Sequence, residues 1–174
     1  MRGFVRPVVL MVFLLTIFGL APAVLAAKPT RTLVEFSDPW VFPAGLGCAF
    51  DVGAVPSDGA RGAITDFGDG VTATVGHGNG TFTNLDTGAS YFQMSRYRAI
   101  ETYDPVTNDV VIQLSGRVWF NLYPGDQGPF GLVDEPGALL SIQGQVAYTF
   151  DLDTELVTSF SLDGQATDIC ALLS

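Results

Sequence analysis

The chain contains one histidine, His77, inside a glycine-rich stretch that spans residues 76–80. A Ser-His-Asp triad would have to use this imidazole as its general base. Serines and aspartates are present, but no Gly-x-Ser-x-Gly nucleophile elbow accompanies them. Glycines on both sides of His77 fit the tip of a tight hairpin at least as well. The sequence therefore assigns no catalytic residue, and a single histidine is a poor basis for a zinc site.

The two cysteines, Cys48 and Cys170, stand about 120 residues apart. That separation matches neither a metal-binding motif nor a Cys-x-x-Cys redox motif. In an oxidising compartment an even pair is typical of one disulfide, whereas two buried thiols or a thiol nucleophile are the rival interpretations. We expect the Cys48–Cys170 disulfide, which would tie the start of the domain to its end and contribute roughly 2–5 kcal/mol.

Clustered carboxylates are the other groups that could do chemistry. Oxygen ligands on loops can hold Ca²⁺, and two carboxylates facing each other across a cleft can hydrolyse a glycosidic bond. No cluster follows the spacing of a helix-loop-helix calcium loop, and acidic residues also favour turns for backbone reasons. We assign no cofactor and no metal-binding residue, with Ca²⁺ kept as an alternative. The clusters are Asp66 with Asp69, Asp134 with Glu135, and Asp151 with Asp153 and Glu155.

Among the aromatic residues, Trp40 and Trp119 stand out, because Trp119 falls on the polar face of an expected strand. Exposed there beside Tyr123 and near Arg117, it would form a platform for a ligand. Alternatively a loop or the N-terminal strand covers it, and this second arrangement is the one we expect.

The first 26 residues predict a secretory signal peptide. Arg2 and Arg6 make a basic start, residues 8–20 are apolar apart from one threonine, and small or medium-sized residues precede Ala26. We expect cleavage after Ala26, with Ala23 as the second choice and an uncleaved membrane anchor as the alternative. The mature chain, residues 27–174, would then be secreted and extracellular, and it has the size of a single domain.

The charge of the chain limits its partners. Eight basic residues stand against 18 acidic ones, a net charge of −10. Loss of the leader would remove two arginines and make the balance more acidic still. Such a chain repels phosphate backbones and anionic lipid surfaces, so nucleic acid and, after signal cleavage, membranes are excluded as expected partners.

Two long segments alternate apolar and polar residues with a period of two, the pattern of a strand with one buried face. They span residues 110–122 and 140–152, and both carry Gly-x-Val-x-aromatic, starting at Gly116 and Gly144. A glycine on the inner face of a long strand usually marks a bend or a bulge. The predicted buried positions include Ile112, Leu114, Val118, Phe120, Ile142, Val146 and Tyr148. The predicted outward positions include Gln113, Arg117, Gln143 and Gln145.

Shorter strand candidates cover most of the remaining chain, and no convincing helix follows Thr30. They are residues 32–37, 48–55, 62–67, 71–76, 80–85, 91–102 and 156–162, with turns at 85–88, 104–109 and 151–155. This pattern predicts an all-β antiparallel meander forming a closed or nearly closed barrel, with a β-sandwich as the alternative. In a closed meander the disulfide would fasten the seam between the first and last strands.

One connection, residues 123–137, is too long to be a simple turn and contains three prolines and four glycines. It could cover the mouth of a barrel. The arrangement that we expect is a packed surface loop with Phe130 and Leu132 as its own small core.

Several segments carry a resemblance to a known group. They are residues 48–52, 82–88, 115–120, 123–128 and 167–172, in this order along the chain. The sequence resembles a group of small exported actinobacterial proteins that are functionally uncharacterised, and the match covers most of the mature chain. The resemblance implies export and paired cysteines near the two ends of the domain. It implies no activity and transfers no catalytic residue.

These observations favour an exported, non-catalytic β-barrel-like module, which could bind a small apolar ligand or a surface component. The alternatives are a secreted hydrolase or isomerase with its site at the barrel mouth, and a structural surface protein. A large cavity with convergent polar groups would favour the first two, and a fully packed interior the third.

Overall fold

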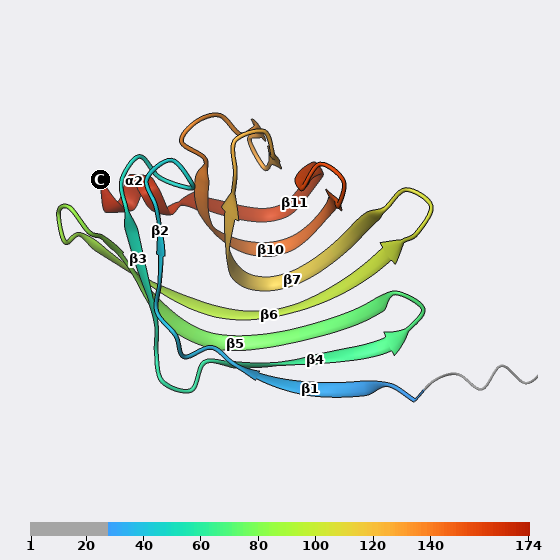
Figure 1. Cartoon of the computed structure of the whole chain (residues 1–174). Coiled ribbons are helices and arrows are strands. Elements are labelled where there is room, and N and C mark those ends of the chain that lie inside the picture. The colour runs from blue at the N-terminus through green and yellow to red at the C-terminus, as the bar shows by residue number, and fades with distance from the viewer. Residues whose placement is uncertain (1–27) are drawn as a thin grey trace, which may run out of the picture.

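The computed structural model describes residues 28–174, so the predicted signal peptide and its cleavage site lie outside the described residues. This part of the chain folds into strands and one short helix (Figure 1). The elements are β1 (Thr30–Glu35), β2 (Trp40–Phe42), β3 (Val52–Pro56), β4 (Arg61–Gly68), β5 (Val71–Asn84), β6 (Ser90–Asp104), β7 (Asp109–Leu122), β8 (Gln127–Gly128), β9 (Gly131–Leu132), β10 (Ala138–Asp151), β11 (Leu156–Asp168) and α2 (Ile169–Leu173).

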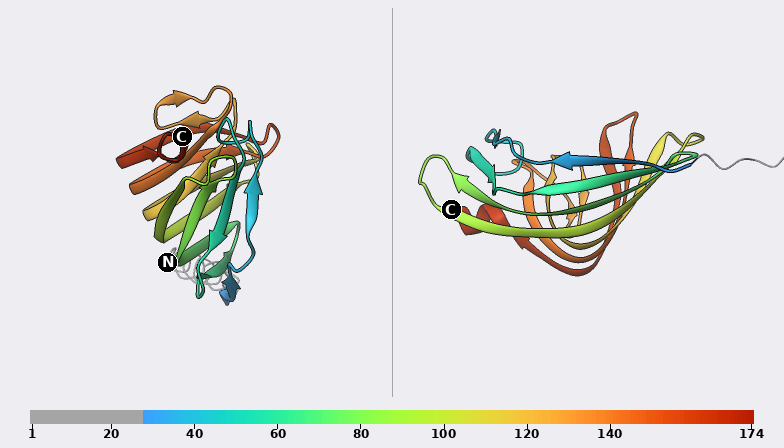
Figure 2. Two further views of the ribbon diagram at one scale, coloured as in Figure 1. Left: turned by 90° about the vertical axis from the view of Figure 1, so that its left-hand side faces the viewer. Right: turned by 90° about the horizontal axis from the view of Figure 1, so that it is seen from below.

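The long strands form one antiparallel sheet in the order β1–β4–β5–β6–β7–β10–β11. β5 changes partner along its length: it pairs with β4 up to His77 and with β3 from Gly80 onward. β2 extends the branch through β3, and β8 with β9 form a separate small ribbon. The strands bow along their length, so that the sheet forms a trough (Figure 2). The predicted all-β antiparallel fold is confirmed.

A row of glycines crosses the sheet where the strands bow. Gly62, Gly76, Gly116, Gly144 and Gly164 are aligned by the strand register, with Val34 of β1 and Tyr97 of β6 as the other members of the row. Gly116 and Gly144 have φ values of 123° and 144°, which side-chain-bearing residues rarely adopt. A Cβ at either position would also collide with a carbonyl oxygen of the neighbouring strand. The predicted glycine bends are therefore present on β7 and β10, in register.

Beyond the glycine row the sheet separates into two layers. β6 pairs with β7 only as far as Arg96 and Arg117, although β6 continues beside β5 to Ser90. One layer consists of β2, β3 and the adjoining ends of β5 and β6. The other consists of β7, β10 and β11 with α2. Their facing residues pack into a common core that contains Val52, Phe82 and Leu139.

The expected closed barrel is not formed by the described residues. The strand order is an open path that has β1 at one edge and β11 at the other. The second half of β5 takes β3 as its neighbour, and β3 and β2 rise across one end of the trough (Figure 1). The strands that could have continued a ring instead form a second layer over Trp119. The sandwich alternative fits this arrangement.

The predicted strand phase is largely confirmed. Ile112, Leu114, Val118, Ile142 and Val146 are buried in one core on the inner face of the sheet. Phe120 and Tyr148, expected in the same core, are only half-buried. Gln113, Gln143 and Gln145 are exposed on the outer face, and Arg117 is half-exposed there. The alternation of side chains therefore identified the faces, but not the space left beside Phe120 and Tyr148.

His77 does not lie at a hairpin tip, as the glycines around it suggested. β5 runs without interruption from Val71 to Asn84, and His77 lies in its middle. The glycines mark the place where β5 exchanges β4 for β3. A Cβ at Gly78 would lie 2.6 Å from the Cβ of Ala60. The connection from β3 to β4 can therefore pass this close to β5 only because residue 78 has no side chain.

The last residues form a helix that the sequence did not predict. α2 has five residues, too few to show a helical period. Asp168 caps it, because its carboxylate accepts a hydrogen bond from Ala171 N at 3.2 Å. Ile169 and Leu173 are fully buried beneath the helix.

The predicted disulfide is present, with the Cα atoms of Cys48 and Cys170 5.5 Å apart. It does not join the first strand to the last. Cys48 lies between β2 and β3, and Cys170 lies in α2. The bridge therefore ties the two layers together at the end of the molecule where the sheet has separated.

The long connection 123–137 does not have its own core, because Phe130 and Leu132 are 76% and 60% exposed. Instead Val133 packs on the inner core, and Asp126 attaches the loop to β11. The Asp126 carboxylate is buried and accepts hydrogen bonds from Tyr123 N at 2.7 Å and Val157 N at 2.8 Å. Asp126 is therefore a structural residue that holds the loop on β11.

Candidate ligand cavity

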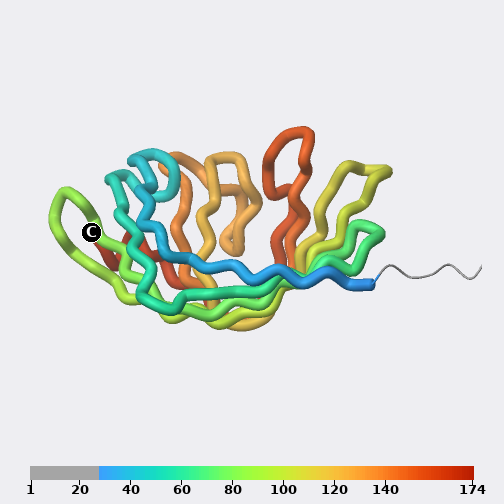
Figure 3. Tube along the Cα trace, turned by 60° about the horizontal axis from the view of Figure 1, so that its bottom comes forward, coloured from blue at the N-terminus to red at the C-terminus, as the bar shows by residue number. Residues whose placement is uncertain are grey.

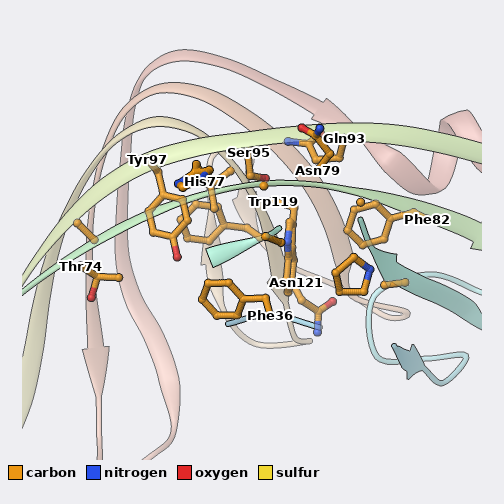
Figure 4. Close-up of a pocket in the computed structure, with 18 of the residues that line it drawn as sticks. Phe36, Thr74, His77, Asn79, Phe82, Gln93, Ser95, Tyr97, Trp119 and Asn121 are labelled. Carbon is orange, nitrogen blue, oxygen red and sulfur yellow. The ribbon is translucent and has the colours of Figure 1, made fainter. Parts of the chain in front are cut away.

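A cavity of about 420 Å³ lies where the two layers separate, beside the inner side of the glycine row. Strands β3, β5, β6 and β7 supply most of its wall, and Tyr148 reaches it from β10. The lining is mainly apolar, and its aromatic members include Phe82, Tyr97, Trp119, Phe120 and Tyr148. Figure 4 shows how Phe82, Tyr97 and Trp119 surround its centre. No residue of the loop 123–137 borders it.

Trp119 forms the end wall of this cavity. Its ring centroid lies 5.7 Å from Trp40, 5.7 Å from Phe42 and 5.8 Å from Phe82. The contacts with Phe42 and Phe82 are edge to face and the contact with Trp40 is tilted, and aromatic contacts of this length are favourable beyond the apolar area that they bury. The N-terminal strand β2 therefore covers Trp119, as expected, and the alternative of an open surface platform is not seen. The covered ring still presents part of its surface to the cavity.

A second aromatic group lies on β7, β10 and β11. Phe120 contacts Tyr148 and Phe160 edge to face, at centroid distances of 5.5 and 5.8 Å. Phe120 and Tyr148 border the space, and Phe160 supports them from β11. The rings of both aromatic groups are therefore held by contacts with one another, so the cavity is formed without any ligand.

The tyrosines of the wall are kept neutral. Burial, with a smaller contribution from the nearby Glu101 carboxylate and Tyr97, raises the pKa of Tyr148 to about 12. Burial and Glu101 also raise the pKa of Tyr97 above its ordinary value. Both phenols therefore act as hydroxyl groups at neutral pH, and neither is a general base. Glu101 is the one carboxylate of the lining.

Two amide side chains border the cavity with polar atoms that lack a partner. Gln93 is 2% exposed, and its Nε2 donates to Met94 O at 3.1 Å, but its Oε1 accepts nothing from the described protein. Asn121 has neither Nδ2 nor Oδ1 bonded within the described chain. Figure 4 shows Gln93 and Asn121 on the two sides of Trp119. Unpaired buried amides cost roughly 1–3 kcal/mol each, so they call for a partner.

His77 does not take part in a catalytic arrangement. Its side chain is exposed, and its Nε2 accepts a hydrogen bond from Arg61 Nε at 3.1 Å. A nitrogen that already accepts from a guanidinium cannot at the same time take a proton from a serine. The residue also borders the cavity, where Figure 4 shows it near Tyr97 and Ser95.

The acidic clusters serve turns. Asp66 accepts from Gly68 N, and Asp151 accepts from Asp153 N, both at 2.8 Å. The bond from Asp153 N, followed by bonds from Thr154, holds the pKa of the Asp151 carboxyl below its usual value. The β4–β5 and β10–β11 turns lie at one end of the trough (Figure 3). Nevertheless, no three acidic, histidine or cysteine side chains gather as a metal site within residues 28–174.

Sequence reasoning did not find Gln93 and Asn121. Gln93 lies on the inner side of β6 between Tyr91 and Ser95. A polar residue on the face of the strand that is turned inward was the sequence signal for this position. Asn121 lies on the outer face of its strand by period, like Trp119. It becomes internal only because β3 and β5 cover that end of β7.

No helix of the described chain is long and apolar enough to cross a membrane. Searches with the whole sequence and structure found no matching protein-family model, no matching curated protein and no matching solved structure. The resemblance to small exported actinobacterial proteins therefore stays a prediction.

Proposed function

We propose that this protein is an exported, non-catalytic binding module that holds one small, mostly apolar molecule in the cavity at Trp119. The observation that carries this proposal is the combination of an aromatic wall with the unpaired amides of Gln93 and Asn121. The aromatic rings favour an apolar body, and the amides favour a hydroxyl, carbonyl or amide group on it.

The size of the cavity supports a ligand of intermediate size. Small-molecule sites typically occupy about 300–1,000 Å³, and a dry cavity of roughly 150 Å³ can hold benzene. The space of about 420 Å³ therefore suits two or three fused rings, or a short branched chain. The bowed sheet acts as an open, barrel-like cup, and β2 and β3 close one end of it.

Secretion is part of the proposal. The Cys48–Cys170 bridge fits an oxidising compartment, as does a leader with the features of a signal peptide. A hydrolase or isomerase is less well supported, because the titratable side chains of the lining are one carboxylate, two tyrosines that stay protonated, and His77, whose Nε2 already accepts from Arg61.

The test compares two ligands that differ by one hydroxyl, naphthalene and 2-naphthol, by equilibrium dialysis against residues 27–174. We expect both to bind with one site, and 2-naphthol to bind about three- to tenfold more tightly, because one hydrogen bond contributes about 0.5–1.5 kcal/mol. Asn121→Leu should abolish most of that preference and leave naphthalene binding intact.

Gln143→Leu is the matched control, because it removes an exposed amide from the outer face of β10. It should leave both affinities unchanged. Absence of binding by either compound would refute the proposal, as would binding that Asn121→Leu and Gln143→Leu alter equally.

A further inference from the structure

The outer face of the sheet carries a row of basic side chains. Arg61, His77, Arg96 and Arg117 lie on β4, β5, β6 and β7, and each is the direct register partner of the next. The row continues through Gln143 on β10 and Gln165 on β11. Glu35 of β1 stands at its other end, opposite Arg61. We call Arg61, His77, Arg96 and Arg117 the outer arginine row.

The arginines are concentrated on this face to a degree that the overall charge does not suggest. Arg31, Arg61, Arg96, Arg98 and Arg117 are all the arginines of the described chain, and the register puts every one on the outer face. The whole chain carries a net charge of −10. The acidic residues lie mainly in turns, so the face is a basic strip on an acidic molecule.

Two open hollows, of about 1050 and 900 Å³, lie along the row. They share His77, Arg96 and Ser115, so they form one continuous groove across the strands. Arg61 borders the first hollow, and Arg117 with Gln143 borders the second. One carboxylate, Asp58, stands on the rim of the second hollow.

Within the described residues, no hydrogen-bonded carboxylate balances the positive charges of the row. Arg61 donates to His77, and Arg117 donates to Gln143, so these bonds pair cationic side chains with neutral acceptors. Arg96 stands directly opposite Arg117 across the strands, and like charges in that position destabilise a sheet. An anion bound between them would remove this repulsion.

We propose that the outer arginine row binds a linear anionic polysaccharide that carries one carboxylate per sugar. Neighbouring strands lie about 4.8 Å apart, so Arg96 and Arg117 are separated by one such step and Arg61 and Arg96 by two. An extended chain of sugar rings advances by a similar length per ring, so its carboxylates recur at multiples of one strand step. Guanidinium groups pair with carboxylates through two parallel hydrogen bonds.

The rest of the groove fits sugar hydroxyls. Ser115 lies between the arginines on the outer face, and Gln143 and Gln165 continue the row beyond them. The acidic surroundings oppose polymers with a denser charge, such as polyphosphate or nucleic acid. A polyuronate has a lower charge density and many neutral hydroxyls. This inference does not depend on the cavity, with which the row shares only His77.

The test measures binding of a hexamer of galacturonic acid to residues 27–174 by calorimetry at low and physiological salt. We expect saturable binding that weakens with salt. The double variant Arg96→Gln/Arg117→Gln should lose at least tenfold in affinity. The control Lys28→Gln/Thr107→Asp makes the same change in net charge at exposed positions outside both hollows, and it should lose less than twofold.

Three comparisons make the outcome decisive. The methyl-esterified hexamer, which has the same rings without charge, should not bind. Hexametaphosphate and a short oligodeoxythymidine should bind at least tenfold more weakly than the galacturonate. The proposal is overturned by no binding, by equal losses in the two double variants, or by tighter binding of either phosphate polymer. The Arg96→Gln/Arg117→Gln variant should keep its melting temperature and its affinity for 2-naphthol, because both side chains lie on the outer face.

Discussion

Polar side chains enter the interior in two regions, and the two regions treat them differently. Beside α2, the Asn84 Nδ2 donates to Leu173 O at 3.0 Å, and its Oδ1 accepts from Asp86 N and Thr87 N. At the cavity, Asn121 makes no hydrogen bond within the described chain. The first asparagine is a structural joint, and the second keeps its bonding capacity free. The contrast separates polar side chains that hold the fold together from polar side chains that are left unpaired at the cavity.

The largest effect should come from the joint beside α2. Cys48→Ser should lower the free energy of unfolding by about 2–5 kcal/mol, since the bridge closes a long loop in the unfolded chain. Cys170→Ser should do the same, and the double variant should match either single variant, as measured by urea denaturation. Additive losses would show that the cysteines stabilise the protein separately rather than through one bridge.

Asn84→Leu tests the same region without touching the disulfide. It leaves Leu173 O, Asp86 N and Thr87 N without their partner, which should cost about 2–4 kcal/mol. The measurement is again urea denaturation. A change below about 0.5 kcal/mol would mean that the Asn84 bonds do not hold α2 in place.

Alkaline titration tests the cavity side. Burial raises the pKa of Tyr148 from 10.0 to about 12. The neutral phenol therefore stabilises the fold below pH 10, and this contribution is lost as pH rises through 12. The loss should be on the order of 2 kcal/mol. Tyr148→Phe should be less sensitive to pH over this range in thermal melts monitored by circular dichroism. Equal alkaline losses in both proteins would contradict the burial of this phenol.

The smallest effect has the opposite sign. Asn121→Leu should raise the free energy of unfolding by about 1 kcal/mol, because it removes an unpaired buried amide without removing a bond. The same change should weaken the preference for 2-naphthol, so stability and binding move in opposite directions. Destabilisation as large as that of Asn84→Leu would remove the distinction between the two regions.

The sequence was enough for the parts of the fold that depend on local pattern. The period of two identified the buried faces of β7 and β10, and the glycines at 116 and 144 located their bends. The isolated pair of cysteines identified the disulfide. These features follow from side-chain alternation, backbone freedom and residue count, each of which a single sequence displays.

The candidate sites depend on pairings that no local pattern contains. Asn121 becomes internal because the neighbour of β5 changes from β4 to β3 along its length. No residue near position 121 indicates that change. The outer arginines are scattered over four strands, and only the register brings Arg61, Arg96 and Arg117 into one row. The barrel prediction was wrong about closure for the same reason, since closure depends on which strands meet at the edges.

The central claim is that the cavity at Trp119 is a binding site whose unpaired amides recognise a polar group. A crystal structure of residues 27–174 with 2-naphthol tests it most directly. We predict one molecule in the cavity, with its ring against Trp119 and its hydroxyl within hydrogen-bonding distance of Gln93 Oε1 or an Asn121 amide atom. A cavity filled by ordered water that bonds both amides, with naphthol absent or bound elsewhere, would contradict the account.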